Sequence, residues 1–295
     1  WDIKVSPNLP NPDCYLPNNG GYHDDSIDIQ INVTYWTQDL QQVDAPGEGT
    51  TTVMSARVKL TDVSQFRTGF ANKYPSKQAR HVNDMTKRFN AVMGIDGDYC
   101  LYHEQGIVVR NGQTLRMRPH KGRDELIVDE NGDFHLITCT TQAKWDEYIA
   151  GGGTVLHAFC FGPALVVDGV PLTSLDDVTI DNGKAKKAQR MVIGQIGKLE
   201  YLILTNEGPE STAPKSVGFD LVQMANLCVQ FGLDNAYNLD GGSSSTIALN
   251  NQKINSPSSH KNRMVGDCIW FATLVKEETW REEASVQTVE VEENK

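Results

Sequence analysis

Short apolar stretches separated by turn dipeptides dominate this chain of 295 residues and limit the folds open to it. Each stretch is too short for a typical helix, and several alternate apolar with polar residues, which is typical of β-strands. Asn-Gly and Asp-Gly pairs favour tight hairpins, and they occur at Asn111-Gly112, Asn131-Gly132, Asp168-Gly169 and Asn182-Gly183. The predicted strands cover residues 26–36, 52–60, 92–95, 106–110, 125–128, 134–139, 155–159, 164–167, 191–196, 199–205, 236–239, 246–249 and 268–275.

Helical periodicity is limited to two segments. Residues 76–90 carry Lys and Arg late in the pattern, and residues 218–231 carry Asp220 near their start, as helix ends favour. Because strands outnumber helices, the pattern predicts an α+β fold with a large mixed, mostly antiparallel β-sheet and a few packed helices.

Three parts of the chain differ in composition. Residues 1–50 form an N-terminal part, in which residues 1–25 are an irregular lead-in rich in Pro, Asn, Gly and Asp and the first predicted strand follows. Residues 51–275 hold most of the periodic pattern and form the main predicted domain. Residues 276–295 are rich in Glu and are predicted to be a solvated tail.

Composition and charge exclude several classes of function. The hydrophobic content of 39% is enough for a substantial core. A net charge of −11 with no Lys/Arg-rich stretch argues against nucleic-acid binding. No apolar run is long enough for a membrane span. The sequence begins with Trp1 rather than Met, which suggests that a signal or anchor has been removed.

The cysteines and histidines do not indicate a metal centre. The six cysteines include no Cys-x-x-Cys pair, and most are expected to be buried thiols, with one disulfide involving Cys14 left open. The histidines show no His-x-x-x-His spacing, and Gly151-Gly152-Gly153 lacks the Lys-Ser/Thr of a phosphate-binding loop. We therefore expect no cofactor.

One polar stretch is hard to explain as packing. Residues 237–246 read Tyr-Asn-Leu-Asp-Gly-Gly-Ser-Ser-Ser-Thr, so an apolar strand runs into an acid, two glycines and a run of hydroxyls. Glycines let a ligand approach the backbone, and hydroxyls donate and accept hydrogen bonds. Asp240 is therefore the first candidate for a functional carboxylate, although Asp also commonly caps a turn.

This stretch resembles the Leu-Asp-Gly-Gly-Gly-Ser-Ser-Thr motif of the phosphodiester glycosidase family, and further motifs follow in family order over about residues 50–275. They are Gly94–Tyr99, Gly106–Gly112, Phe161–Val166, Arg190–Gly194 and Asn262–Val265. Of these, Gly106–Gly112 also resembles bacterial members. The resemblance makes residues 51–275 the catalytic domain.

The chain departs from the family pattern at four places. Asp96 replaces the usual Asn, Gln189 the usual Pro before Arg190, and Ser243 the third glycine. Glu207-Gly208-Pro209 stands where the family has Asp-Gly-Arg, so an arginine is missing. If that arginine binds phosphate, this protein prefers another substrate or is a poor catalyst.

The resemblance implies cleavage of the bond between an anomeric carbon and a phosphate oxygen. A phosphate monoester is a good leaving group, so such a site needs cations and a carboxylate more than a general acid. Asp240 and Asp96 are the catalytic candidates, and Arg190 and Arg263 are candidates for phosphate binding. The remaining candidates for substrate binding are Gly97, Gly241, Gly242, Ser244 and Ser245. Asp96 and Asp98 could also be metal ligands or solvated acids of a turn.

The expected protein is an exported bacterial hydrolase that releases a sugar such as N-acetylglucosamine (GlcNAc) from a sugar-1-phosphate diester. Its expected partner is a phosphorylated glycan, for example an exopolysaccharide. The alternative is a non-catalytic carbohydrate- or cell-wall-binding protein on the same fold, which the missing arginine favours.

Overall fold

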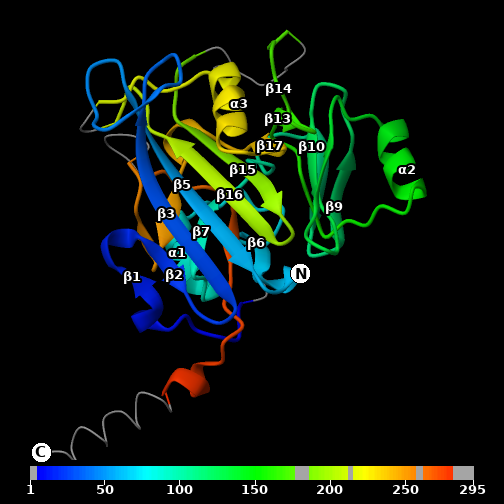
Figure 1. The fold of residues 1–295 in the computed structure, drawn as a ribbon. Helices are drawn as coiled ribbons and strands as arrows, with labels where there is room; N and C mark the ends of the chain where they lie inside the picture. The colour runs from blue at the N-terminus through cyan, green and yellow to red at the C-terminus, as the bar shows by residue number, and fades with distance from the viewer. Residues whose placement is uncertain (1–4, 177–185, 212–214, 257–261, 282–295) are drawn as a thin grey trace, which may run out of the picture.

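The structure is a computed structural model that describes residues 5–176, 186–211, 215–256 and 262–281. The predicted turn at Asn182-Gly183 and most of the predicted tail lie outside the described residues. Figure 1 shows three β-sheets with short helices around them. The strand pairings between named strands of the described residues are antiparallel, so the predicted α+β class is confirmed, with the strands divided among three sheets rather than one.

The largest sheet has ten strands in the order β1-β2-β3-β5-β16-β15-β17-β13-β14, with β4 beside β3. The strands are β1 (Tyr15–Leu16), β2 (Gly21–His23), β3 (Ile27–Trp36), β4 (Gln42–Val43), β5 (Thr51–Leu60), β13 (Ala164–Val167), β14 (Val170–Pro171), β15 (Arg190–Gly197), β16 (Glu200–Asn206) and β17 (Asn235–Asn238). β3 pairs with β5 along its whole length. The expected lead-in therefore contributes strands to the same sheet as the main domain.

Two five-stranded sheets complete the fold, with strand orders β19-β18-β7-β20-β6 and β11-β10-β12-β8-β9. The second sheet contains β6 (Phe66–Phe70), β7 (Met93–Asp96), β18 (Ile247–Leu249), β19 (Gln252–Lys253) and β20 (Asp267–Phe271). The third sheet contains β8 (Gly106–Arg110), β9 (Gln113–Arg118), β10 (Glu125–Val128), β11 (Phe134–Ile137) and β12 (His157–Phe159). β6 and β9 were not predicted from the sequence.

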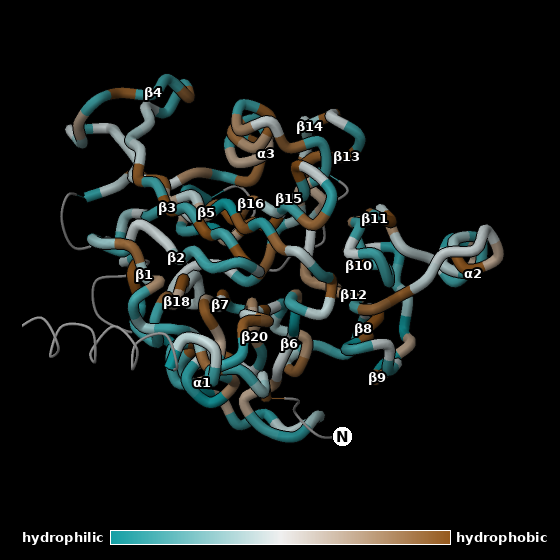
Figure 2. The backbone as a smooth tube through the Cα atoms, turned by 60° about the horizontal axis from the view of Figure 1, so that its bottom comes forward, coloured by the Kyte–Doolittle hydropathy of each residue, from teal (hydrophilic) through white to brown (hydrophobic). Residues whose placement is uncertain are grey.

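The main hydrophobic core lies between the first and second sheets. Its buried side chains include Ile29 and Ile203 from the first sheet and Ile95, Ile247 and Ile269 from the second. Figure 2 shows the two rows of strands facing each other. Burying apolar faces between two packed sheets is the main favourable term for such a sandwich.

Helices cover the outer faces of all three sheets. α3 (Leu221–Gln230) packs on the first sheet through Leu221, Met224 and Leu227, and α1 (Val82–Phe89) packs on the second through Phe89, whose ring stacks on Trp270. The third sheet carries α2 (Gln142–Ala150), which Figure 1 shows at the edge of the molecule. Trp145 of α2 packs on Ile127 of that sheet.

Local interactions explain where α3 and α1 begin. Asp220 and Gln223 form a reciprocal capping box at the start of α3, which agrees with the predicted start signal. α1 begins at Val82 rather than residue 76, because Arg80 instead forms a β-bridge with Val265. α2 was not predicted.

The turn dipeptides behave as predicted where they are described. Asn111-Gly112 and Asp168-Gly169 have positive φ at both residues, as a two-residue hairpin of this hand requires, and Gly132 also has positive φ. All six cysteines are free, and four of them are buried. Within the described residues, no helix is both long and apolar enough to cross a membrane.

Candidate active site

The predicted motifs meet where the first and second sheets end side by side. Asp240 follows β17 of the first sheet, and Gly97 follows β7 of the second. The Asp240 backbone N–H donates to the Gly97 carbonyl at 3.1 Å, and the Thr246 N–H donates to the Asp96 carboxylate at 2.8 Å. Segments about 140 residues apart in sequence are therefore hydrogen-bonded into one unit.

A cleft of about 480 Å³ opens above this unit. Asp240, Arg190 and Arg263 all line it, so the two arginines and the carboxylate lie on one face of the molecule. The remaining lining residues are Phe161, Lys186, Lys187, Ala188, Gln189, Pro209, Glu210, Asn238, Gly241, Gly242 and Ser243. Pro209 occupies the position where the family pattern has an arginine, so the departure falls in the wall of the cleft.

Asp240 has the environment of a reactive carboxylate. Burial raises its pKa to about 6, while the Ser244 hydroxyl, the charge of Arg263 and the Gly241 N–H, which donates to it at 2.9 Å, hold the pKa from rising further. At pH 7 the group is mainly ionised, yet its affinity for a proton is higher than that of a solvated aspartate. A pKa near the working pH suits a group that takes up protons.

Asp96 lies beneath the cleft rather than in its wall. Its side chain is fully buried, so the expectation of solvated turn acids is wrong for this residue. Burial and the neighbouring charge of Asp240 raise its pKa well above the usual range. One carboxyl oxygen accepts from Thr246, and the other has no hydrogen-bond partner among the described residues. A protonated Asp96 presents a carbonyl acceptor and an O–H donor, so it resembles the Asn of the family pattern, whose amide presents a carbonyl acceptor and an N–H2 donor group.

Replacing Asp96 by Asn should therefore stabilise the protein above neutral pH. The folded pKa lies above the unfolded value of about 3.9, so the stability that the group contributes is fully present below that value and is lost as pH rises. Relative to wild type, Asp96→Asn should gain about 1.4 kcal/mol per pH unit between the two pKa values. Urea unfolding at several pH values measures this, with exposed Asp44→Asn as the control. If the difference in unfolding free energy between Asp96→Asn and wild type does not change with pH, the raised pKa of Asp96 is wrong.

Of the four consecutive hydroxyl residues 243–246, one lines the cleft and three are buried. Ser244 and Ser245 were expected to contact substrate, but both are fully buried and neither lines the cleft, whereas Ser243 does. Ser244 lies beside Asp240 and lowers its pKa. The Ser245 and Thr246 hydroxyls have no hydrogen-bond partner among the described residues. Ser243 was not among the predicted binding residues, and the one sequence signal for it is that it replaces the third glycine of the family motif.

The three glycines of the site have different reasons to be glycine. A Cβ at Gly97 would lie 2.2 Å from a carboxylate oxygen of Asp267, so this glycine makes room for a buried side chain. A Cβ at Gly241 would meet the Gln189 carbonyl at 3.0 Å. Gly242 has a φ of +62° and donates its N–H to that same carbonyl at 3.0 Å. Gly241 and Gly242 line the cleft, and Gly97 does not.

The two candidate arginines differ in what they bind. Arg190 is buried, and its guanidinium donates to the carbonyls of Phe219 at 3.3 Å and Lys186 at 2.7 Å. Burial lowers its pKa to about 10, so it stays charged at pH 7. Arg263 is exposed, lies over the Tyr99 ring at 5.8 Å and lowers the pKa of Asp240. Arg263 is thus the better placed to meet an anion.

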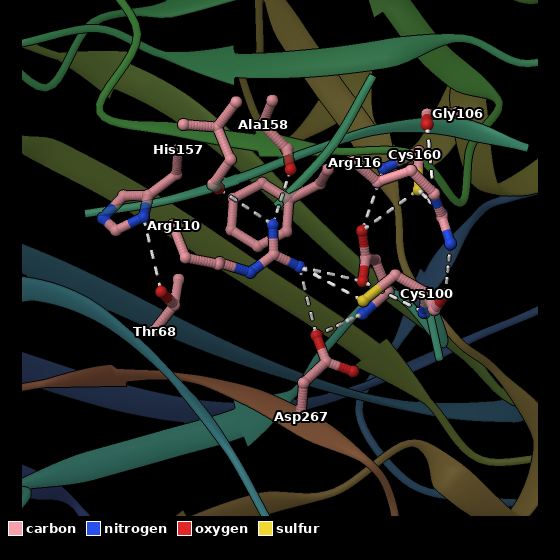
Figure 3. Close-up of polar contacts among 12 residues, drawn as sticks. Thr68, Cys100, Gly106, Arg110, Arg116, His157, Ala158, Cys160 and Asp267 are labelled. Atoms are coloured by element: carbon pink, nitrogen blue, oxygen red, sulfur yellow. Dashed lines mark hydrogen bonds and ion pairs between the residues drawn. The ribbon is translucent and has the colours of Figure 1, made fainter. Parts of the chain in front are cut away.

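Figure 3 shows a buried cluster of charged and polar side chains around Arg110. Arg110, which is 1% exposed, donates to Asp98 at 2.9 Å and to Asp267 at 3.3 Å, and its guanidinium lies 4.4 Å from the centre of the Phe159 ring. Burial favours the protonated form of both acids, but Arg110 and the Cys160 N–H hold the pKa of Asp98 below its usual range. The pKa of Asp267 is raised to about 8 by burial and by Asp98.

The Arg110 cluster also bears on the alternative that Asp96 and Asp98 are metal ligands. Ligand atoms of Asp98, Cys100 and Asp267 lie within 4.8 Å of one another. Arg110 reaches all three of these side chains and supplies a positive charge among them. No role was predicted for Arg110, because nothing in a strand pattern shows which arginine points into the core.

One carboxylate, two arginines and two lysines thus line a single cleft, a set of groups that suits a small anionic ligand. The chain belongs to the phosphodiester glycosidase family, whose family model matches residues 89–272. A comparison with curated protein sequences finds no match.

Three solved structures share the fold. The catalytic domain of zebrafish N-acetylglucosamine-1-phosphodiester alpha-N-acetylglucosaminidase, auto-inhibited by its pro-peptide, aligns with a TM-score of 0.65 at 14% identity, over 86% of each chain. A hypothetical protein from Synechocystis aligns with 0.55 at 13%, over 83% of this chain and 62% of its own. A protein from Burkholderia pseudomallei K96243 described as exported aligns with 0.52 at 15%, over 78% and 75%.

Proposed function

We propose that this protein hydrolyses the glycosidic bond of a sugar-1-phosphate diester, giving free sugar and a phosphomonoester. The observation that carries the proposal is that Asp240 lines one cleft with Arg263 and Arg190. Lys186 and Lys187 add further positive charge to its wall. Family membership supports the reaction class, and the zebrafish enzyme's printed name supports GlcNAc as the first sugar to test.

In this proposal Arg263, with Lys186 and Lys187, binds the phosphate, Arg190 holds the cleft wall through backbone carbonyls, and Asp240 acts at the anomeric carbon. Because the departing group is a phosphate, Arg263 can stabilise its charge without prior protonation. Asp240, with its pKa of about 6, is ionised at neutral pH and either attacks the carbon or activates water. Asp96 stays protonated beneath it and serves as a neutral support.

The direct test is release of free sugar from a methyl diester of GlcNAc-1-phosphate. We expect turnover that requires ionised Asp240. The rival function is non-catalytic carbohydrate binding, which Pro209 favours because it puts no charge where the family has an arginine. Calorimetric binding of the diester with no sugar release over a long incubation would select the rival and reject the hydrolase.

Replacing Arg263 by Lys should weaken catalysis although the charge survives, since one ammonium cannot form a two-pronged contact with phosphate oxygens. We expect kcat/KM to fall about tenfold on the phosphodiester, equivalent to about 1.4 kcal/mol, and much less on an aryl glycoside of the same sugar. Arg190→Lys is the matched comparison. Its kcat/KM should fall by the same factor on both substrates, because the Arg190 guanidinium donates hydrogen bonds to backbone carbonyls. Equal losses for Arg263→Lys would remove it from phosphate binding.

We also propose that the natural substrate is a phosphorylated glycan met outside the cell, as for an exported bacterial protein. The fold shared with the Burkholderia protein described as exported supports this setting. Expressing the full-length gene and fractionating the cells tests this proposal, and we expect the product outside the cytoplasm. Retention in the cytoplasm would reject it.

A further inference from the structure

A second cleft, of about 640 Å³, is lined by a set of residues that shares no member with the first. Its walls come from the segment that joins β7 to β8, from β9 and from the residues around Tyr74. Tyr74 and Tyr102 supply ring surface to this cleft, and Lys77 and Arg118 supply exposed positive charge. Neither the family motifs nor the mechanism above uses it.

Stacked side chains join the two clefts. Arg263, which lines the first cleft, lies over the Tyr99 ring, and Tyr99 stacks on Tyr102 with ring centres 4.5 Å apart and planes at 25°. Tyr102 lines the second cleft. Arg263, Tyr99 and Tyr102 therefore form a chain of contacting side chains that joins the first cleft to the second.

Tyr99 is held in an unusual backbone conformation at this junction. Its φ is +58°, a left-handed value that is uncommon for a bulky residue. The preceding Asp98 is fixed by Arg110 and by the Cys160 N–H. Strained backbone persists where the surroundings fix it, and it is concentrated at binding sites. The position of Tyr99 between the clefts is thus fixed by the surrounding structure.

The second cleft is also preformed. The Arg116 guanidinium donates to the carbonyls of Cys100 at 2.7 Å, His103 at 2.6 Å and Gln105 at 2.8 Å, which fixes the segment that forms one wall. The Tyr102 hydroxyl donates to the Lys77 carbonyl at 3.1 Å and joins that wall to the next. Rigid walls reduce the entropy cost of ordering side chains around a ligand.

We propose that the second cleft binds the leaving-group side of the substrate, so that the enzyme acts on an anionic oligosaccharide rather than on a small phosphodiester. This inference rests on the proposed function. The Tyr102 and Tyr74 rings contact sugar faces, since a sugar ring presents C–H groups that pack on aromatic surface. Lys77 and Arg118 bind further phosphate or carboxylate groups of the glycan. For Lys77 no side-chain partner is seen among the described residues, and Arg118 has only a 3.7 Å pair with exposed Glu104.

The test uses the double variant Lys77→Glu with Arg118→Glu and two substrates. One is the methyl diester, and the other is a GlcNAc-1-phosphate diester of an oligosaccharide that carries further phosphates. We expect KM for the oligosaccharide to rise about tenfold or more with kcat unchanged, while the methyl diester, which ends at the first cleft, keeps its kcat/KM. Lys59→Glu with Lys198→Glu is the charge-matched control, since both lysines are exposed and line neither cleft.

Two outcomes overturn the inference: equal effects on both substrates, or no effect on either. If wild type cleaves neither substrate, the proposed function fails, and calorimetry then tests the cleft alone with the same oligosaccharide. An affinity about tenfold weaker for the Lys77/Arg118 variant than for the control variant supports the cleft, and equal affinities reject it.

Discussion

Asp240→Asn is expected to abolish turnover and leave the fold intact. The change removes the reacting charge without changing volume, and the Asn oxygen can still accept from the Gly241 N–H. Loss of such a group costs on the order of a hundredfold or more in kcat. Sugar release from the methyl diester measures it, with exposed Asp44→Asn as the control.

The pH dependence of wild-type kcat/KM is a second test of Asp240. If ionised Asp240 is the reactive form, kcat/KM should rise with pH through about 6, the pKa that burial gives this carboxyl. Undiminished rate constants for Asp240→Asn, or a profile flat across that range, would remove Asp240 from the mechanism.

Arg110→Met is expected to cause the largest loss of stability of any single change considered. It leaves Asp98 buried without the cation that keeps it ionised. Removing one member of a buried ion pair typically costs about 3–5 kcal/mol, because the remaining charge is uncompensated. Urea unfolding at pH 7 measures the loss.

Two further variants separate the charge from the packing. Arg118→Met removes an exposed arginine from the neighbouring strand and should change the unfolding free energy by less than about 0.5 kcal/mol. Arg110→Met combined with Asp98→Asn should recover part of the loss, since both charges are then gone. A loss no larger for Arg110→Met than for Arg118→Met would show that the cluster does not stabilise the fold.

The strands were predictable where apolar runs end at turn dipeptides. β8 and β9 flank Asn111-Gly112, yet β9 was missed because its Gln-Thr-Leu-Arg-Met-Arg sequence belongs to a half-exposed edge strand. β6 was missed because Phe-Arg-Thr-Gly-Phe is short and contains glycine. α2 buries only Trp145, so it lacks the apolar stripe that marks a helix in a sequence.

The site was predictable as a set of residues but not as an arrangement. Family motifs named Asp240, Asp96, Arg190 and Arg263, and three of these line the cleft. That Asp96 lies beneath it, and that Arg190 turns toward backbone carbonyls, depends on tertiary packing that no local pattern encodes. The role proposed for each residue stays a prediction until the variants are measured.

The Arg110 cluster has a consequence for how the molecule folds. Arg110 comes from the third sheet, Asp267 from β20 of the second, and Asp98 from the segment that leads out of β7 toward the second cleft. A partly folded state with only the two-sheet sandwich in place would leave Asp98 and Asp267 next to each other without their cation. Such a state also lacks the Arg110 guanidinium and the Cys160 N–H that hold Asp98 ionised in the complete fold. The cluster therefore couples the third sheet to the segment after β7, so losing the third sheet should weaken the packing beneath Asp240.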